Sequence, residues 1–107
     1  MGVGIDICYI PRYENKDDLA KRILSNDEYK IYEVRQKKAE FLAGRFATKE
    51  AFIKANGGKI KDLNFKEISV VYDINNCPVL FFRGNQYEVS ISHDGDYAVA
   101  VVIINDK

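Results

Sequence analysis

The stretch that decides the fold is residues 41–55, FLAGRFATKEAFIKA, which predicts a helix that is apolar almost all round. At helical spacing the carboxylate of Glu50 shares an apolar stripe with Phe46 and Ile53, one turn before it and one turn after it. Lys54 stands beside Glu50 at the i+4 position. Because an unpaired carboxylate in apolar surroundings is costly, we expect Glu50 to have a partner. That partner is either Lys54 or a metal ion shared with a second acid, and the helix alone leaves both open.

The segments before this helix predict a strand and two further helices. The opening run is rich in β-branched residues and stops at Pro11, which is typical of a strand over residues 2–10. Apolar residues then recur at helical spacing, and Asn26 and Asp27 are candidate caps for the second of these helices. The three helices are expected over residues 17–25, 27–37 and 39–55, and an Asn-Gly-Gly run ends the last of them.

The remainder of the chain predicts β structure. Apolar runs separated by turn-forming residues indicate strands over residues 66–72, 79–82, 87–92 and 97–104. The last strand is apolar on both faces, so we expect it at the centre of a sheet or against another subunit. The fold class is therefore α+β, with helices packed on an antiparallel sheet in one domain over residues 1–107.

The composition argues against a disordered or membrane-spanning chain. Apolar residues make up 47% and charged residues 30% of the sequence, and no apolar run approaches the ~18 residues of a membrane span. The start of the chain lacks the pattern of a signal peptide, so we expect a cytoplasmic protein with no membrane and no nucleic acid among its partners. Cys8 and Cys77 lack CxxC spacing, which predicts buried free thiols. His93 is the only histidine, which argues against a histidine-based metal cluster.

Charge is balanced overall, with 16 basic and 16 acidic residues, but it is unevenly distributed. Residues 39–66 carry six basic side chains against three acidic ones, whereas residues 67–107 carry two against six. The basic segment includes the Glu50 helix, so an anionic ligand near that helix is plausible. A solvated surface is the simpler explanation for the lysines at positions 59, 61 and 66.

Three features of the sequence could carry chemistry. Asp6 lies within the first strand, Glu50 lies with Lys54 and Arg45 on the central helix, and His93 follows a strand in the segment 90–94. Each of these is weak alone, since an isolated acid, ion pair or histidine is more often structural. Together they allow two carboxylates to share Mg²⁺, which takes few protein ligands and prefers phosphate oxygens. Lysine and arginine beside such a site would neutralise phosphoryl oxygens.

Three segments, in this order, carry a resemblance to a known family. They are Val3–Ile7 (VGIDI), residues 41–55 as quoted above, and Ser90–His93 (SISH). The chain resembles holo-[acyl-carrier-protein] synthase, the small class of 4′-phosphopantetheinyl transferases. The resemblance covers nearly the whole chain, and the central motif is long enough to be specific.

The resemblance implies a magnesium-dependent enzyme that supports fatty acid biosynthesis. Such an enzyme moves the 4′-phosphopantetheine group of coenzyme A to a serine of apo-acyl carrier protein and releases adenosine 3′,5′-bisphosphate. In the family, the acids matching Asp6 and Glu50 hold Mg²⁺ against the pyrophosphate, and the lysine matching Lys54 contacts phosphate. Glu50 is also a candidate acceptor of the serine proton, directly or through a metal-bound water.

The resemblance also implies how the substrates and subunits are arranged. The side chains matching Arg45 and His93 lie around the 3′-phosphate and adenosine of coenzyme A. Arg12 falls where the family uses a basic residue to dock the acidic helix of the carrier protein. Family members of this size form homotrimers with active sites at the subunit interfaces, which suits a last strand that is apolar on both faces.

The chain departs from the family pattern at two positions, and other functions remain possible from the sequence. Cys77 stands where a glycine is common, and Asp94 follows the SISH segment where a small hydroxyl residue is usual, which argues against direct contact of Asp94 with a 3′-phosphate. One alternative is a non-enzymatic binding module in which Glu50 and Lys54 form an ion pair. A second alternative is a magnesium-dependent phosphohydrolase that uses the same acids.

Overall fold

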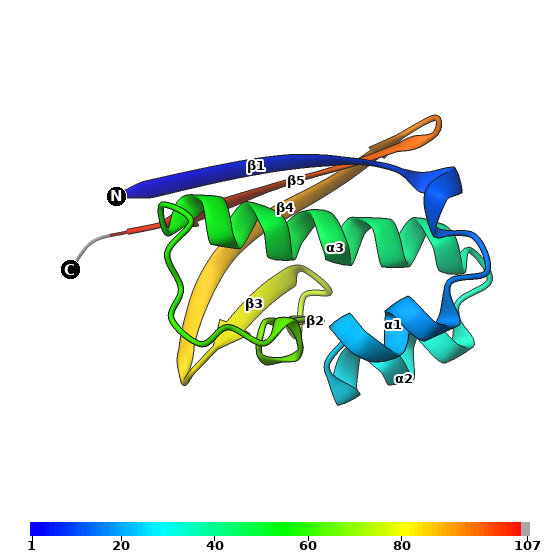
Figure 1. Cartoon of the computed structure of the whole chain (residues 1–107), viewed down its shortest axis with the longest axis horizontal. Coiled ribbons are helices and arrows are strands. Elements are labelled where there is room, and N and C mark those ends of the chain that lie inside the picture. Colours follow the sequence, from blue (N-terminus) through cyan, green and yellow to red (C-terminus); the bar gives the residue numbers. More distant parts are fainter. Residues whose placement is uncertain (106–107) are drawn as a thin grey trace.

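The computed structural model describes residues 1–105, which form three α-helices on one face of a five-stranded antiparallel sheet (Figure 1). The strands are β1 (Gly2–Tyr9), β2 (Ser69–Tyr72), β3 (Pro78–Phe82), β4 (Asn85–Asp94) and β5 (Tyr97–Ile104). The helices are α1 (Asp17–Ile23), α2 (Asn26–Val34) and α3 (Lys38–Ala55), with short 3₁₀ turns η1 (Ile10–Tyr13) and η2 (Phe65–Glu67). This arrangement confirms the predicted α+β class.

The sheet has the strand order β1-β5-β4-β3-β2, so β1 and β2 are its two edge strands. All neighbouring strands pair antiparallel. Helix α3 runs along β1 and β5, while α1 and α2 pack beside the other end of the molecule, near β2 (Figure 1). One side of α3 therefore faces edge strand β1 and the other faces edge strand β2. A polar side chain of α3 can reach one or the other edge, depending on its side of the helix.

Strand β1 lies unusually close to α3 because two of its residues lack side chains. A Cβ atom at Gly4 would overlap the carbonyl oxygen of Ala51, and one at Gly2 would overlap that of Ala55. Such contact between backbones is open only to glycine. The close approach brings Asp6, the next inward-facing residue of β1, up to the last turns of the helix.

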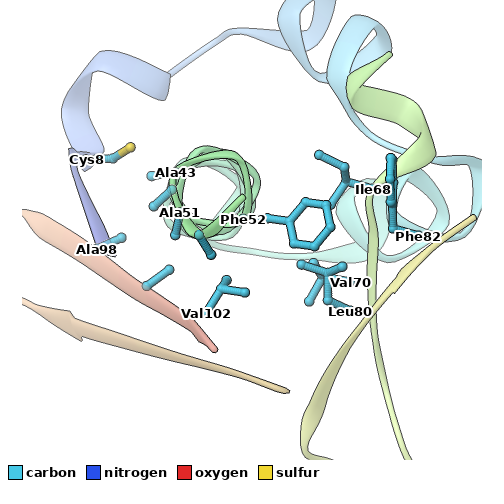
Figure 2. Close-up of a cluster of buried hydrophobic side chains, with 13 residues drawn as sticks. Cys8, Ala43, Ala51, Phe52, Ile68, Val70, Leu80, Phe82, Ala98 and Val102 are labelled. Atoms are coloured by element: carbon cyan, nitrogen blue, oxygen red, sulfur yellow. The ribbon is translucent and has the colours of Figure 1, made fainter. Parts of the chain in front are cut away.

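The main core fills the space between α3 and the sheet (Figure 2). Small residues of α3, such as Ala51, sit over β1 and β5, whereas Phe52 points toward the other half of the sheet. The ring of Phe52 lies 5.1 Å from the ring of Phe82 and 5.1 Å from that of Tyr87, measured between centroids. A second cluster joins α1 and α2 to α3 and contains the buried residues Ala20, Ile23, Leu24, Tyr32, Phe41 and Leu42.

The outer face of the sheet carries an exposed apolar surface on β1 and β5. On β5, Val102 is buried against the helix layer while its neighbour Val101 faces outward. Cross-strand register pairs the outward residues of the two strands, because Val101 lies opposite Ile5. Ile5 is 60% exposed, as are its neighbours on the same face of β1. The outer-face surface consists of Val3, Ile5, Ile7, Tyr9, Tyr97, Val99, Val101 and Ile103.

Most predicted elements are confirmed, and the differences have local causes. The cap of α2 is Ser25, which forms a reciprocal capping box with Glu28, so the predicted caps Asn26 and Asp27 are wrong. Residues 65–67 form a 3₁₀ turn because Asn64 caps them, and β2 starts only at Ser69.

Two further expectations differ from the structure. His93 and Asp94 belong to β4 rather than to the turn that follows it. Cys8 is buried as expected, but Cys77 is exposed. Within residues 1–105, no helix is both long and apolar enough to span a membrane.

Candidate active site

Lys54, at the end of α3, reaches the edge strand β1. Its Nζ atom donates to the carboxylate Oδ1 of Asp6 at 3.0 Å and to the carbonyl oxygen of Ile5 at 3.1 Å. The Lys54 side chain is 54% exposed and that of Asp6 is 18% exposed. Lys54 therefore pairs with Asp6, and the simpler expectation that it pairs with Glu50 is wrong.

Glu50 is half-buried and, within residues 1–105, makes no hydrogen bond or ion pair. Glu50 lies one turn before Lys54 on α3, and Lys54 contacts Asp6, so the side chain of Glu50 is on the side of the helix that faces Asp6. Burial is the main cause that raises the pKa of Cys8, and the negative charges of Asp6 and Glu50 raise it further. The Cys8 thiol also donates to Asp6 Oδ2 at 3.8 Å. The two predicted metal-binding acids thus lie on the same side of α3.

The two acids fit a hard cation that also binds substrate oxygens. Within the described residues, no group of three or more His, Cys, Asp or Glu side chains gathers for a metal. A site built from Asp6 and Glu50 alone would leave most coordination positions to water and phosphate, as Mg²⁺ prefers. The unpartnered carboxylate of Glu50 supports such a site, and the exposed ammonium of Lys54 is free to exchange Asp6 for a phosphoryl oxygen.

Arg45 lies on the opposite side of α3 and is only 3% exposed. Its Nε–H group donates to the carbonyl oxygen of Val70 at 3.2 Å, on the other edge strand, β2. Its guanidinium carbon lies 4.3 Å from the ring centre of Phe41 and 5.2 Å from that of Tyr72. The Nη2 atom is buried and makes no hydrogen bond to any group of residues 1–105. A buried donor without an acceptor costs about 1–3 kcal/mol, so this nitrogen is suited to a ligand anion.

A cavity of about 320 Å³ opens beside Arg45 and is mainly basic. His93 lines it from β4 and lies beside Gly44 of α3, where a Cβ would stand 3.4 Å from His93 Nε2. Asp94 is not among the lining residues. The full lining is Val34, Arg35, Gln36, Lys37, Glu40, Phe41, Gly44, Arg45, Tyr72 and His93, in which Glu40 is the single acid. The cavity is therefore suited to an anionic ligand.

One protomer does not bring all the predicted site residues together. Arg45 and Lys54 are nine residues apart, which turns them about 180° from each other around an α-helix. Their partners confirm the separation, because Lys54 contacts edge strand β1 and Arg45 contacts edge strand β2. The candidate site residues thus fall into two groups on one protomer, one with Asp6 and Glu50 and the other at the basic cavity.

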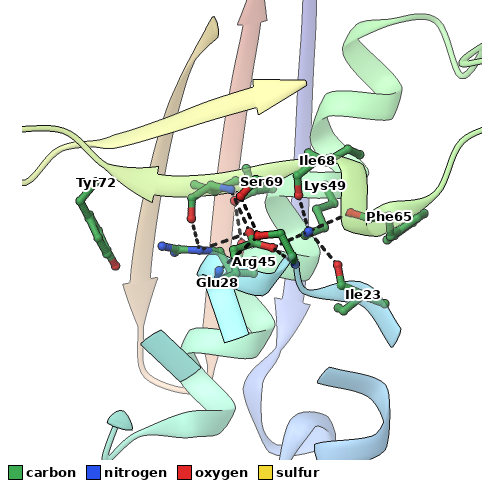
Figure 3. A network of polar contacts seen from close by, with 12 residues as sticks. Ile23, Glu28, Arg45, Lys49, Phe65, Ile68, Ser69 and Tyr72 are labelled. Atoms are coloured by element: carbon green, nitrogen blue, oxygen red, sulfur yellow. Dashed lines mark hydrogen bonds and ion pairs between the residues drawn. The ribbon is translucent and has the colours of Figure 1, made fainter. Parts of the chain in front are cut away.

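Sequence analysis missed a buried ion pair between Lys49 and Glu28 (Figure 3). Both side chains are fully buried, and Lys49 Nζ lies 2.7 Å from Glu28 Oε1. The ammonium also donates to the carbonyl oxygens of Ile23 at 2.8 Å, Phe65 at 2.9 Å and Ile68. Burial lowers the pKa of Lys49, and the charge of Glu28 opposes that shift. Four oxygen acceptors nevertheless require the protonated amine.

The sequence carried a signal for this pair. Lys49 lies seven residues after Leu42 and three before Phe52, so it occupies the same apolar stripe as these two buried residues. The expectation that a charged side chain in an apolar stripe needs a partner, which was applied to Glu50, therefore holds more strongly for Lys49. Because Lys49 is fully buried and saturated with protein oxygens, it cannot contact a substrate.

Arg12 lies in η1 on the exposed surface. Its guanidinium carbon lies 5.9 Å from the ring centre of Tyr9, and within residues 1–105 it forms no ion pair. Basic side chains of the neighbouring segment are also exposed, namely Lys16, Lys21 and Arg22. This surface can receive an acidic partner.

Comparison with known proteins places the chain among enzymes of one family. A curated holo-[acyl-carrier-protein] synthase from Streptococcus pyogenes serotype M12 (strain MGAS2096) is 39% identical over 116 aligned residues, covering all of this chain and 98% of the relative. The solved structure of a holo-(acyl-carrier-protein) synthase from Bacillus anthracis in complex with CoA (3′,5′-ADP) has a TM-score of 0.83 at 38% identity, covering 94% of this chain and 92% of that one.

A second solved structure agrees. Holo-[acyl-carrier-protein] synthase from Helicobacter pylori, in complex with coenzyme A, has a TM-score of 0.83 at 32% identity and covers 96% of this chain and 99% of that one. The model of the 4′-phosphopantetheinyl transferase superfamily matches residues 2–102. On the fold, the motif residues and these matches together, the chain belongs to the 4′-phosphopantetheinyl transferase superfamily.

Proposed function

We propose that the chain is a holo-[acyl-carrier-protein] synthase, which transfers 4′-phosphopantetheine from coenzyme A to a serine of apo-acyl carrier protein and so supports fatty acid biosynthesis. The observation that carries the proposal is the grouping of Asp6, Glu50 and Lys54 on one side of α3, in a chain whose relatives carry this name. Two acids and one flexible ammonium suit phosphoryl transfer, in which catalysis consists mainly of positioning and charge neutralisation. The cytoplasmic location stays a prediction from the sequence.

The chemistry follows from the side chains on the β1 edge. Asp6 and Glu50 would hold Mg²⁺, which supplies charge neutralisation at the pyrophosphate when bound. Lys54 leaves Asp6 and donates to a phosphoryl oxygen. The serine hydroxyl oxygen forms a bond to the β-phosphorus, and the bond from that phosphorus to the bridging oxygen breaks. Adenosine 3′,5′-bisphosphate leaves with the bridging oxygen, and Glu50 accepts the serine proton, directly or through water.

The nucleotide end of coenzyme A fits the other half of the site. The unpartnered Nη2 atom of Arg45 supports binding of the 3′-phosphate, and the basic cavity supports it further. His93 lines the same cavity and would lie beside the phosphate or the adenosine. This assignment agrees with the family roles of both residues.

A homotrimer would join the two halves. Because Arg45 and Lys54 point to opposite edges of the sheet, coenzyme A would bridge the Asp6 side of one protomer and the Arg45 side of the next. The exposed outer-face surface on β1 and β5 supports assembly, since contiguous apolar surface of this kind marks interaction sites in soluble proteins. The family supplies the number three, and cyclic symmetry would give three equivalent sites.

Docking of the carrier protein would use Arg12 and the exposed basic side chains that follow it. Rim charges act mainly by steering association, so they would affect the carrier protein more than coenzyme A. The exposed guanidinium of Arg12, which forms no ion pair within residues 1–105, supports this assignment.

One incubation tests the proposal. The protein is mixed with coenzyme A, Mg²⁺ and an apo-acyl carrier protein, and the carrier protein is weighed by mass spectrometry. We expect an increase of one phosphopantetheine unit, which depends on the carrier serine and on Mg²⁺. A binding module would leave the carrier mass unchanged, and a phosphohydrolase would release its product without any carrier protein. Either result would refute the transferase.

A further inference from the structure

Three buried charged side chains lie at the junction of α2, α3 and β2 (Figure 3). Glu28 and Lys49 are 0% exposed and Arg45 is 3% exposed. Two cations and one anion leave this cluster with an uncompensated positive charge. Since a buried net charge is costly, the cluster is suited to an anion from outside the protein fold.

The two oxygens of Glu28 have different partners. Oε1 accepts from Lys49 Nζ at 2.7 Å and from the backbone N–H of Ser25 at 2.8 Å. Oε2 accepts from the backbone N–H of Val70 at 2.9 Å and lies 3.8 Å from Arg45 Nε. The Lys49 contact is a charge-assisted hydrogen bond, whereas the Arg45 contact is longer than a hydrogen bond. Glu28 is therefore neutralised mainly by Lys49, and Arg45 keeps its charge for another anion.

The guanidinium of Arg45 has polar contacts at its Nε edge and aromatic rings against its plane. Glu28 and the carbonyl oxygen of Val70 lie at its Nε edge, and the rings of Phe41 and Tyr72 lie over the guanidinium. Tyr72 is fixed in turn, because Arg35 Nη2 donates to its hydroxyl oxygen at 2.8 Å. Within residues 1–105, the buried Nη2 atom of Arg45 makes no hydrogen bond. Glu28 also accepts a hydrogen bond from the backbone N–H of Val70. The Glu28 carboxylate therefore holds in place both oxygen groups near Arg45 Nε, its own Oε2 and the carbonyl of Val70.

We propose that Glu28 is a positioning residue, which holds Arg45 so that its guanidinium lines the cavity that takes the 3′-phosphate of coenzyme A. Lys49 is its necessary companion, because it offsets the Glu28 charge that would otherwise weaken the attraction of Arg45 for phosphate. The inference rests on the proposed function and on the assignment of the 3′-phosphate to the Arg45 cavity. It adds that affinity for this phosphate is controlled by a side chain on α2 that cannot touch it.

The test compares coenzyme A with 3′-dephospho-coenzyme A, which lacks only the 3′-phosphate. For each protein, the ratio of kcat/KM for coenzyme A to that for the dephospho form measures recognition of this phosphate. We expect Arg45→Met to abolish most of the preference and Glu28→Gln to reduce it about tenfold, a difference of about 1.4 kcal/mol. The loss in Glu28→Gln should lie in KM for coenzyme A, with kcat nearly unchanged.

A double-mutant cycle separates positioning from general destabilisation. If Glu28 acts through Arg45, the double variant Glu28→Gln/Arg45→Met has the same preference as Arg45→Met alone. A merely structural role would lower kcat/KM equally for both substrates and leave the preference intact, which would overturn the inference. An unchanged preference in Arg45→Met would overturn it too, while carrier modification by the wild type would still support the proposed function. Glu67→Gln, at an exposed acid paired with Arg83, is the matched control and should leave the preference unchanged.

Folding of the variants needs its own safeguard, since Glu28→Gln leaves Lys49 without its anion. Glu28→Gln/Lys49→Met removes the pair together, and it should show the same reduced preference if the single variant does not fold. The wild type offers a measurement that needs no variant. The Nε–H resonance of Arg45 should be protected from exchange at neutral pH, and adenosine 3′,5′-bisphosphate should shift the Nη signals while Nε–H stays in place. A rapidly exchanging Arg45 Nε–H would contradict the inference.

Discussion

Lys54 Nζ donates to Asp6 Oδ1 at 3.0 Å and so connects the end of α3 to edge strand β1. The lysine is more than half exposed, and an ion pair of this kind contributes only about 0–1 kcal/mol to stability. The pair is therefore dispensable for folding. For the proposed function its position one turn from Glu50 is what counts, because Lys54 and Asp6 can exchange each other for a phosphoryl oxygen and a metal, and Glu50 has no partner within residues 1–105 to give up.

Asp6→Asn and Glu50→Gln should each lower kcat by roughly 100-fold or more, because metal charge stabilisation is worth several kcal/mol. Both changes keep side-chain volume, so thermal unfolding should be nearly unchanged. Activity is measured against Mg²⁺ concentration, and both variants should show a weakened Mg²⁺ response. The double variant Lys54→Met/Glu50→Gln should be folded and inactive. Near-wild-type turnover in either single variant would rule out the metal assignment.

Two variants that are each impaired at low coenzyme A concentration should recover activity when they are mixed. If each site takes Glu50 from one protomer and Arg45 from the next, random mixing of Glu50→Gln with Arg45→Met protomers leaves about a quarter of the sites intact. The mixture is unfolded, refolded together and assayed at low coenzyme A concentration. Asp6→Asn mixed with Glu50→Gln is the control, because both changes lie in the same half and no site can be repaired. No recovery in the test mixture would place the whole site within one protomer, and recovery in the control would mean that Asp6 and Glu50 of one site come from different protomers.

Arg12→Glu should raise KM for the carrier protein far more than KM for coenzyme A. The reversed charge repels the acidic partner, and the effect should shrink with added salt, since the screening length falls to ~3 Å at 1 M. Lys61→Glu, at another exposed basic residue, serves as the control and should change neither KM. An equal rise for both substrates would remove Arg12 from the docking surface.

Val101→Lys should lower the oligomer mass and the activity together, because Val101 faces outward from β5 opposite Ile5. Light scattering gives the mass, and circular dichroism confirms that the variant is folded. Phe81→Lys, at an exposed apolar residue of β3, is the matched control and should keep both mass and activity. Val102→Lys would instead disrupt the core, since Val102 is fully buried. A fully active wild-type monomer would contradict the proposed interface.

Lys49→Met should destabilise the fold by about 3–5 kcal/mol, because it leaves the carboxylate of Glu28 buried without its main partner. Urea unfolding at fixed protein concentration measures the loss, since assembly also contributes to stability. Adding Glu28→Gln should recover much of it by removing the buried charge. Equal stability of Lys49→Met and the wild type would mean that Glu28 finds another cation.

The sequence predicted the central helix and the β elements because apolar spacing and turn residues carry that information locally. Helix α3 starts within one residue of its predicted start, and β5 matches its predicted range. The cap of α2 was misplaced because several cap-forming residues adjoin, and only the reciprocal bonds of Ser25 and Glu28 decide among them.

The residues of the candidate site were proposed from the sequence, but their pairing could not be. Helical spacing put Lys54 next to Glu50, but spacing along one helix cannot show that Asp6 of β1 comes closer. Nor could it show that Glu28, from another helix, meets Lys49 in the core. Such contacts depend on tertiary packing, and the glycines of β1 make the first of them possible.

Helix α3 also fixes the distance and the angle between the two groups of candidate site residues. Nine residues separate Arg45 from Lys54, which fixes an axial offset of about 13.5 Å at ~1.5 Å per residue. One inserted residue between them would advance one residue by a single rise and turn it by roughly 100° relative to the other, so the two could no longer both face their own edge strands. Insertions or deletions between Arg45 and Lys54 should therefore be incompatible with the proposed function. Insertions in the loop from 56 to 64 should be tolerated, since Gly57 and Gly58 have open space around them.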